Sequence, residues 1–273
     1  SAGQTTTADI TAKSLTVSNV SASNKTYDGT TTALMDGTSA VYSGLVDGDT
    51  FDGTYTGAFS DKNVGTSKTV NITSSYSGSD VNNYSVTDQS TTTANITAKS
   101  LTVSGITASD KTYDGSTSAT LTGTAVYSGL VAGDTFDGSY TGVFSNANVA
   151  SGKTVNITST YSGADVNNYS VTDQSTTTAS ITQKALTATA SASNKTYNAT
   201  NSASVTLTLS GLIGSETLGS TNTSTFNNKN VGSNKTVTVN SITLADGSGL
   251  AANYLISAGQ TTTANITPKA LTV

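Results

Sequence analysis

The sequence predicts an all-β fold: tandem small β-sandwich repeats of Ig-like size, arranged end to end in an elongated rod. Three observations predict it. Apolar residues alternate with polar ones, the same motifs return about every 85 residues, and Asn, Asp and Gly cluster between the alternating stretches. Such alternation is typical of strands with one buried and one solvated face, and the clusters supply turn residues. No apolar period of 3.6 residues is long enough to predict a helix.

The repeat is marked by the string ITAKSLTV and its close variants. The string begins at Ile10, Ile96, Ile181 and Ile266, so the intervals are 86, 85 and 85 residues. Other motifs return at nearly the same step, among them NKTYDG, FSDKNVG and DVNNYSV. A fixed period of this length indicates an array of similar structural units.

Domain boundaries follow from this spacing. SAGQTTTADITAK at the start of the chain nearly repeats residues 257–269, and no linker composition separates the units. The first segment is therefore interpreted as the end of one repeat, and the final ALTV as the beginning of another. The predicted segments are the last strand of a preceding repeat (1–13), two similar β repeats (14–99 and 100–184), a diverged third repeat (185–269), and the start of a following repeat (270–273).

Within the first unit, the stretch FDGTYTGAF places aromatic residues and glycines on one face and Thr on the other. The turns are expected in NKTYDGT, VDGD, SDKNVG and SGSDVNN, which carry Asn, Asp and Gly. Six to seven short strands are expected per unit, in two layers. The candidate core residues are Tyr27, Phe51, Tyr55, Phe59, Val70, Ile72, Tyr84 and Ile96.

Composition excludes several kinds of chemistry. The 273 residues include no Cys and no His, all twelve basic residues are Lys, and the net charge is −5. A Ser-His-Asp triad, an ordinary zinc site, a thiolate nucleophile and a disulfide framework are therefore ruled out. An acidic chain without Arg is a poor match for nucleic acid or anionic lipid. We expect no catalytic, cofactor-binding or metal-binding residue, no cofactor, no nucleic-acid partner, no membrane insertion and a monomeric chain.

The order of motifs resembles a known family. KTYDG, GDTF, FSDKNVG, KTV, NYSV and a closing ANIT follow one another as in the YDG/MBG-type β repeats of filamentous-haemagglutinin-like bacterial surface exoproteins, and the resemblance covers the whole chain. It implies a large adhesin or biofilm matrix protein, secreted to the outer surface of a Gram-negative bacterium. It also implies repeats that form a stalk, with no catalytic residues to carry over. The third repeat departs from the pattern, because Asn198-Ala199 replaces Asp-Gly.

A calcium loop is one candidate site, since Asp47, Asp49 and Asp52 are rich in oxygen ligands. The second repeat keeps Asp134 and Asp137 but has Ala132, and the third repeat keeps only Glu216. The alternative interpretation, turn-forming Asp beside Gly, is favoured because the ligand number falls from unit to unit.

The Tyr-Asp-Gly motif is a second candidate. It recurs as Tyr27-Asp28-Gly29 and Tyr113-Asp114-Gly115, and as Tyr197-Asn198-Ala199 in the third repeat. The Tyr could stack on a sugar, but a structural role is favoured, in which Asp-Gly supplies a positive φ and the Tyr covers the end of the core.

Three weaker possibilities remain open. A Lys–Asn isopeptide bond would need a buried Lys beside Asn and an acid, whereas Lys is rarely buried unless paired. Thr-rich strands could form a regular recognition surface, although Thr is ordinary strand chemistry. Glycosylation sequons begin, among other places, at Asn24, Asn71, Asn95, Asn156, Asn194 and Asn265.

Competing functions can be ranked on these features. A structural spacer is favoured: strands of about ten residues would give each unit about 35 Å, and three units about 100 Å. Its partners would be neighbouring repeats of the same chain. The alternative is a module whose repeats bind glycans or matrix polysaccharide weakly and multivalently. A glycosidase with paired carboxylates is disfavoured, because no acid has a recognisable catalytic setting.

Overall fold

A computed structural model of the chain describes residues 3–272; Ser1, Ala2 and Val273 lie outside the described residues. The regular elements in this range are β-strands and three single-turn 3₁₀ helices: η1 (Val81–Asn83), η2 (Val166–Asn168) and η3 (Ala251–Asn253). The predicted all-β class with three repeated units is confirmed. None of the helices described is long and apolar enough to cross a membrane.

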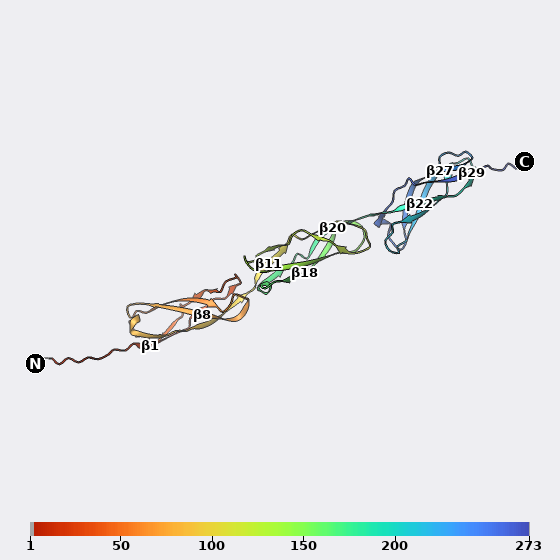
Figure 1. The fold of residues 1–273 in the computed structure, drawn as a ribbon. Coiled ribbons are helices and arrows are strands. Elements are labelled where there is room, and N and C mark those ends of the chain that lie inside the picture. Colours follow the sequence, from red (N-terminus) through yellow and green to blue (C-terminus); the bar gives the residue numbers. More distant parts are fainter. Residues whose placement is uncertain (1–2, 273) are drawn as a thin grey trace. The chain divides into compact units, whose positions relative to one another are not determined.

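A similar series of strands recurs in each repeat (Figure 1). Among the described residues, the first two repeats contain ten strands each, and the third contains nine. The first repeat contains β1 (Lys13–Ser18), β2 (Ser21–Ala22), β3 (Lys25–Thr26), β4 (Thr32–Ala33), β5 (Met35–Asp36), β6 (Val41–Ser43), β7 (Asp52–Phe59), β8 (Gly65–Ser77), β9 (Tyr84–Thr87) and β10 (Thr91–Thr97). The second contains β11 (Lys99–Ser104), β12 (Thr107–Ala108), β13 (Lys111–Thr112), β14 (Ser118–Ala119), β15 (Leu121–Thr122), β16 (Val126–Ser128), β17 (Asp137–Phe144), β18 (Ala150–Ser162), β19 (Tyr169–Thr172) and β20 (Thr176–Thr182). The third contains β21 (Lys184–Ala185), β22 (Thr187–Ala192), β23 (Lys195–Thr196), β24 (Ser202–Ala203), β25 (Val205–Ser210), β26 (Leu218–Phe226), β27 (Gly232–Asp246), β28 (Tyr254–Leu255) and β29 (Thr261–Thr267).

Two larger sheets and one two-stranded sheet, β2-β5, build the first repeat. A three-stranded sheet has the order β6-β1-β9, and a five-stranded sheet has the order β3-β10-β8-β7-β4. β1 runs parallel to β9, and β10 runs parallel to β3. More strands form than the six or seven expected, because two-residue pairings such as β2 with β5 are too short to show alternation in the sequence.

Two compact units divide the described chain. The first joins the residues up to Ser104 with Ala125–Ser139 and Thr160–Gln174, and the second joins Gly105–Thr124 and Tyr140–Ser159 with the residues from Ser175 onward. The first unit therefore contains the first repeat and the part of the second that contacts it. The second unit contains the rest of the second repeat and the third. Each unit includes one junction between consecutive repeats.

Strands pass from one repeat to the next with almost no connection. Only Ala98 lies between β10 and β11, and only Gln183 lies between β20 and β21. Residues 3–12 form no strand, and Ile10 is fully exposed, whereas its equivalent Ile96 is 1% exposed in β10. Ile96 is buried because β10 pairs with β3 and β8. The segment predicted as the last strand of a preceding repeat lacks such partners among the residues described.

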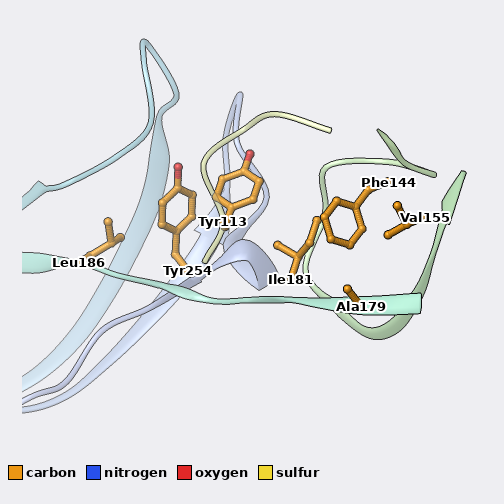
Figure 2. Packing of buried hydrophobic residues seen from close by; sticks show 7 residues of the cluster. All are labelled: Tyr113, Phe144, Val155, Ala179, Ile181, Leu186 and Tyr254. Atoms are coloured by element: carbon orange, nitrogen blue, oxygen red, sulfur yellow. The ribbon is translucent and has the colours of Figure 1, made fainter. Parts of the chain in front are cut away.

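The core follows the alternation seen in the sequence. Six of the eight predicted core residues of the first repeat are buried, while Tyr55 and Ile72 are only half-buried at its edge. Leu15 and Val17 of β1 are also buried, against Phe51 and Tyr84. In the second unit one cluster crosses the junction: Phe144, Val155 and Ile181 belong to the second repeat, and Leu186 and Tyr254 to the third (Figure 2).

Candidate functional site: the contact between consecutive repeats

The Tyr-Asp-Gly motif forms a tight turn on the side of the first repeat that faces the second. The carboxylate of Asp28 accepts hydrogen bonds from the Thr30 amide at 2.8 Å and from the Lys25 ammonium at 2.7 Å. Gly29 has φ of 80°, a conformation that favours glycine. The predicted turn with positive φ is confirmed, and it places Tyr27 at the boundary with the second repeat.

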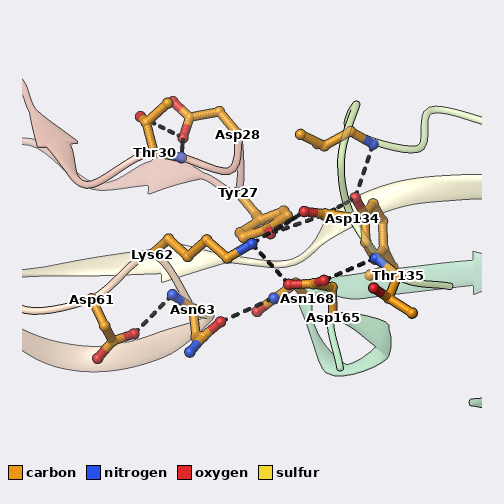
Figure 3. Close-up of polar contacts among 12 residues, drawn as sticks. Tyr27, Asp28, Thr30, Asp61, Lys62, Asn63, Asp134, Thr135, Asp165 and Asn168 are labelled. Atoms are coloured by element: carbon orange, nitrogen blue, oxygen red, sulfur yellow. Dashed lines mark hydrogen bonds and ion pairs between the residues drawn. The ribbon is translucent and has the colours of Figure 1, made fainter. Parts of the chain in front are cut away.

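Tyr27 reaches an acid of the second repeat rather than only covering its own core. Its hydroxyl donates to Oδ2 of Asp134 at 2.9 Å, and its side chain is 1% exposed (Figure 3). Its ring meets that of Tyr169 edge to face, with 5.6 Å between centroids. Burial, and then the carboxylate of Asp134, raise the pKa of the Tyr27 hydroxyl, because both oppose a phenolate. Tyr27 therefore remains a hydrogen-bond donor beyond its ordinary range.

Lys62 is the positive charge of this junction. Its ammonium lies 2.9 Å from Oδ1 of Asp165 and 3.2 Å from Oδ1 of Asp134. The Asp134 side chain is only 3% exposed, so an opposite charge is required to offset its desolvation. The hydrogen bond to Asp165 comes first among the contacts that raise the pKa of Lys62, and Lys62 in turn lowers the pKa of Asp165. The ion pairs thus join the two repeats.

The acid side of the junction is organised by its own repeat. Tyr169 donates to Asp134 and accepts a hydrogen bond from the Val131 amide at 2.9 Å. Burial, followed by the bond to Asp134, raises the pKa of Tyr169 to about 12. The Thr135 amide donates to Oδ2 of Asp165 at 2.9 Å, which leaves Oδ1 for Lys62. The second repeat therefore presents both acids in fixed positions.

Asparagines and one glycine complete the contact. Asn168, which is 3% exposed, accepts from the Val64 amide at 2.9 Å and donates to Oδ1 of Asn63 at 3.2 Å. A Cβ on Gly29 would lie 2.9 Å from Cγ1 of Val131, too close for an ordinary contact. The glycine of the motif is therefore needed for the positive φ and for the approach of the next repeat.

Two names follow from this geometry. The YDG face of the first repeat is Tyr27, Gly29, Lys62, Asn63 and Val64. The acid face of the second repeat is Val131, Asp134, Asp165, Asn168 and Tyr169. Equivalent positions in the other repeats carry the same names.

The junction in the second unit repeats most of this arrangement. The Tyr113 hydroxyl donates to Oε1 of Glu216 at 2.6 Å, and Tyr254 donates to Oε2. The two rings lie edge to face with 5.4 Å between centroids, and Figure 2 shows them side by side. Burial, then Glu216, raise the pKa of Tyr113 to about 12. Asn253 accepts from the Val149 amide at 2.9 Å, as Asn168 does from Val64.

One pair differs between the two junctions. Ala147 occupies the position of Lys62, and Leu250 occupies that of Asp165. Ala147 packs beside the hydrophobic cluster of the second unit. Lys62 and Asp165 are thus replaced together in the second junction, while Glu216 keeps the acid at the position of Asp134 and accepts two tyrosine hydroxyls.

One acid of the candidate calcium loop in each repeat serves another contact. Asp49 accepts a hydrogen bond from Tyr84, and Asp134 and Glu216 accept from tyrosines at the junctions. Asp47 and Asp52 are exposed, as are Ala132 and Asp137 in the second repeat. Across residues 3–272, no group of three or more His, Cys, Asp or Glu side chains could hold a metal ion. The favoured interpretation, an acid that organises a turn, needs one addition: the acid also binds the preceding repeat.

The other sequence candidates lie apart from the junctions. Lys153, which is 8% exposed, donates to Oδ1 of Asn146 at 2.8 Å, the geometry of a hydrogen bond across a turn. Asn24 and Asn194 each accept a backbone amide, whereas Asn71 and Asn156 lie exposed on β8 and β18. All four asparagines are exposed, so burial does not distinguish these sequons.

Sequence reasoning missed the pairing of tyrosine with acid across the junction. One signal was available: Asp49, Asp134 and Glu216 keep an acid at the same position although their acidic neighbours are lost. A position that stays acidic when the other candidate calcium ligands are lost indicates a partner other than calcium. The partner itself could not be read from the sequence, since Tyr27 and Asp134 are 107 residues apart.

Comparison with known proteins agrees with the three repeats seen in the strands. A search of curated proteins gave no match. The family model described as YDG domain matches residues 11–94, 97–179 and 182–264, which together cover most of the chain. The chain therefore belongs to the YDG domain family and carries three tandem copies of that domain.

Proposed function

We propose that these repeats are a structural spacer in the stalk of a large secreted bacterial adhesin or biofilm matrix protein. In that role they would project a distal binding region from the outer surface of a Gram-negative cell. The observation that carries the proposal is the junction itself. The most elaborate polar clusters in each unit join one repeat to the next and leave their acids engaged.

The connection between repeats supports the same role. A single residue separates the last strand of one repeat from the first strand of the next, as at Ala98. A connection this short, combined with buried contacts such as those of Tyr27 and Asn168, limits bending at the junction. Stability in such an array comes from the repeats and from the interfaces between neighbours. A series of stiff junctions is what a spacer needs.

A non-catalytic role is also consistent with the setting of the acids. Asp134 and Asp165 face Lys62, and Asp134 and Glu216 accept tyrosine hydroxyls, so neither junction offers an acid–base pair to a substrate. The surface is otherwise rich in Thr, Ser and Asn. Near-identical copies with such a polar surface would be soluble beside one another.

Small-angle X-ray scattering of the three-repeat chain tests the proposal. The expected maximum dimension is about 100 Å, from strands of about ten residues that rise roughly 3.3 Å per residue. A compact particle, or the scattering of a flexible coil, would contradict a spacer. Reproducible binding of the three-repeat chain on a glycan array would favour the polysaccharide-binding alternative instead.

A further inference from the structure

Two faces of the junction type have no repeat opposite them among the described residues. One is the acid face of the first repeat, and the other is the YDG face of the third. Asn83 is exposed, whereas its equivalents Asn168 and Asn253 are 3% and 1% exposed beneath a neighbouring repeat. Val46 and Val231, which belong to the same two faces, are 44% and 49% exposed.

The acid face of the first repeat is already formed. The Val46 amide donates to the Tyr84 hydroxyl at 3.0 Å, and Tyr84 donates to Asp49. The Thr50 amide holds Oδ2 of Asp80 at 2.9 Å, as Thr135 holds Asp165. A cavity of about 260 Å³ lies over this face, lined in part by Ile10, Val46, Asp49, Asn83 and Tyr84.

The YDG face of the third repeat is also formed. Asn198 accepts from the Thr200 amide at 3.2 Å and from Lys195 at 3.1 Å, which reproduces the turn made by Asp28. Lys229 and Asn230 lie exposed at the positions of Lys62 and Asn63. One difference stands out: Ala199 holds φ of 66° where the other repeats have glycine.

The charges of these two faces match. The first junction joins Lys62 to Asp134 and Asp165, whereas the second joins an alanine face to Leu250. Lys229 corresponds to Lys62 in the sequence, and Asp49 and Asp80 correspond to Asp134 and Asp165. A lysine that enters this acid face would find two carboxylates arranged as Lys62 finds them.

The segment before the first repeat indicates the same partner. Residues 1–4 are SAGQ, as are residues 257–260 of the third repeat, whereas the first two repeats have TDQS at this point. The stretch that leads into the acid face of the first repeat is therefore of the third-repeat type. Residues 3–12 form no strand, so a docking repeat would not have to break a sheet to displace them.

We propose that the acid face of the first repeat binds the YDG face of a third-type repeat, which a second copy of this chain can supply head to tail. Lys229 of one copy pairs with Asp49 and Asp80 of the other, Tyr197 donates to Asp49, and Asn230 meets Asn83. This inference goes beyond the spacer role, because a spacer works without any contact between copies. The contact is weak between free chains, since the tether that raises the effective concentration within one chain is absent.

Ala199 limits the strength of this contact. At the first junction, a Cβ on Gly29 would lie only 2.9 Å from Val131, so the Cβ that Ala199 carries must press on Val46 in the same way. Val46 must therefore shift for the contact to form. Substitution Ala199→Gly removes this obstacle and strengthens the association.

Disulfide trapping tests the proposal, because the chain contains no cysteine of its own. Asn83→Cys and Asn230→Cys place one thiol on each face, and both positions are exposed, so folding should tolerate them. The two variants of the 273-residue chain are mixed in equal amounts and oxidised with glutathione, and the three possible disulfide dimers are quantified. Random coupling would make half of them heterodimers. The proposal predicts that heterodimers rise well above one half and approach all of the disulfide dimers.

Further variants separate a specific contact from random collision. Lys229→Ala on one chain, or Asp80→Asn on the other, should return the share of heterodimers to the random level, while Ala199→Gly should raise it. Asp80→Asn keeps an oxygen for the Thr50 amide, and the exposed Asp52→Asn on β7 is its charge-matched control, with no expected effect. Circular dichroism confirms that each variant is folded.

Random coupling of the two folded cysteine variants would overturn the inference, as would a heterodimer excess that neither charge change reduces. The scattering test of the spacer role is unaffected by either result, so the two proposals can fail separately.

Discussion

Tyr27 donates a hydrogen bond to Asp134, a residue 107 positions further along the chain and in the next repeat. Both side chains are buried by the contact, and Asp134 also receives Tyr169 and Lys62. The same tyrosine–acid contact recurs as Tyr113 with Glu216. A motif that looks like a turn within one repeat is therefore also the means by which it holds its neighbour.

Removal of the Tyr27 hydroxyl should weaken the first junction. Tyr27→Phe keeps the ring against Tyr169 but deletes one donor to Asp134, and the expected loss is about 1 kcal/mol in the free energy of unfolding. Urea unfolding followed by tyrosine fluorescence measures it. Tyr197→Phe is the matched control, because no acid lies opposite Tyr197 in the described part of the chain. Equal losses for both variants would contradict a role in the junction.

Lys62 and Asp165 should behave as a coupled pair. Lys62→Ala leaves two buried acids without their cation, and we expect the melting temperature to fall by about 2–4 °C. Adding Asp165→Leu gives the first junction the same two residue types that the second junction has at these positions, Ala147 and Leu250. The double variant should therefore recover much of the loss in melting temperature. A double-mutant cycle of thermal unfolding measures the coupling. Simple additivity of the two changes would show that the charges do not interact.

Gly29 should tolerate a side chain less well than Gly48. Both residues have positive φ, 80° and 90°, so alanine strains either backbone by roughly 1–2 kcal/mol. Only at Gly29 would the new Cβ approach another repeat, 2.9 Å from Val131, whereas nothing lies within 4 Å at Gly48. Gly29→Ala should therefore cost about 1–3 kcal/mol more than Gly48→Ala in urea unfolding. The combination with Val131→Ala should remove most of this excess.

The third repeat should gain stability from Ala199→Gly. Ala199 holds φ of 66°, and glycine adopts that conformation without the steric cost of a Cβ. The expected gain is about 1 kcal/mol. Thermal unfolding of the wild-type chain and the variant gives the comparison. Destabilisation on this change would mean that the left-handed backbone at this position is not strained.

Alkaline pH should loosen both junctions. Tyr113 and Tyr169 have pKa values raised to about 12 by burial and by their acids, against about 10 in an unfolded chain. A raised pKa contributes stability that is fully present below pH 10 and lost as the pH rises through about 12. Phenolate absorbance during a pH titration measures this. The late step should contain one phenolate fewer in Tyr113→Phe; a loss from the step near pH 10 would contradict it.

The sequence by itself determined the fold class, the repeat period and most of the core. Alternation at every second position identified residues such as Phe59, Val70 and Ile96, because a strand with one buried face imposes that period on its side chains. The Asp-Gly turn was equally readable, since few residues adopt a positive φ. These features depend on neighbours in sequence or on local backbone geometry.

Only the tertiary structure decided what the acids bind. Asp134 has the same local sequence whether it holds calcium, ends a turn or receives Tyr27, and the choice depends on residues more than a hundred positions away. It also separated Tyr55 and Ile72, which share the alternation of the core but lie at its edge. Burial and pairing depend on which surfaces meet in space, and the pattern along one strand carries no information about that meeting.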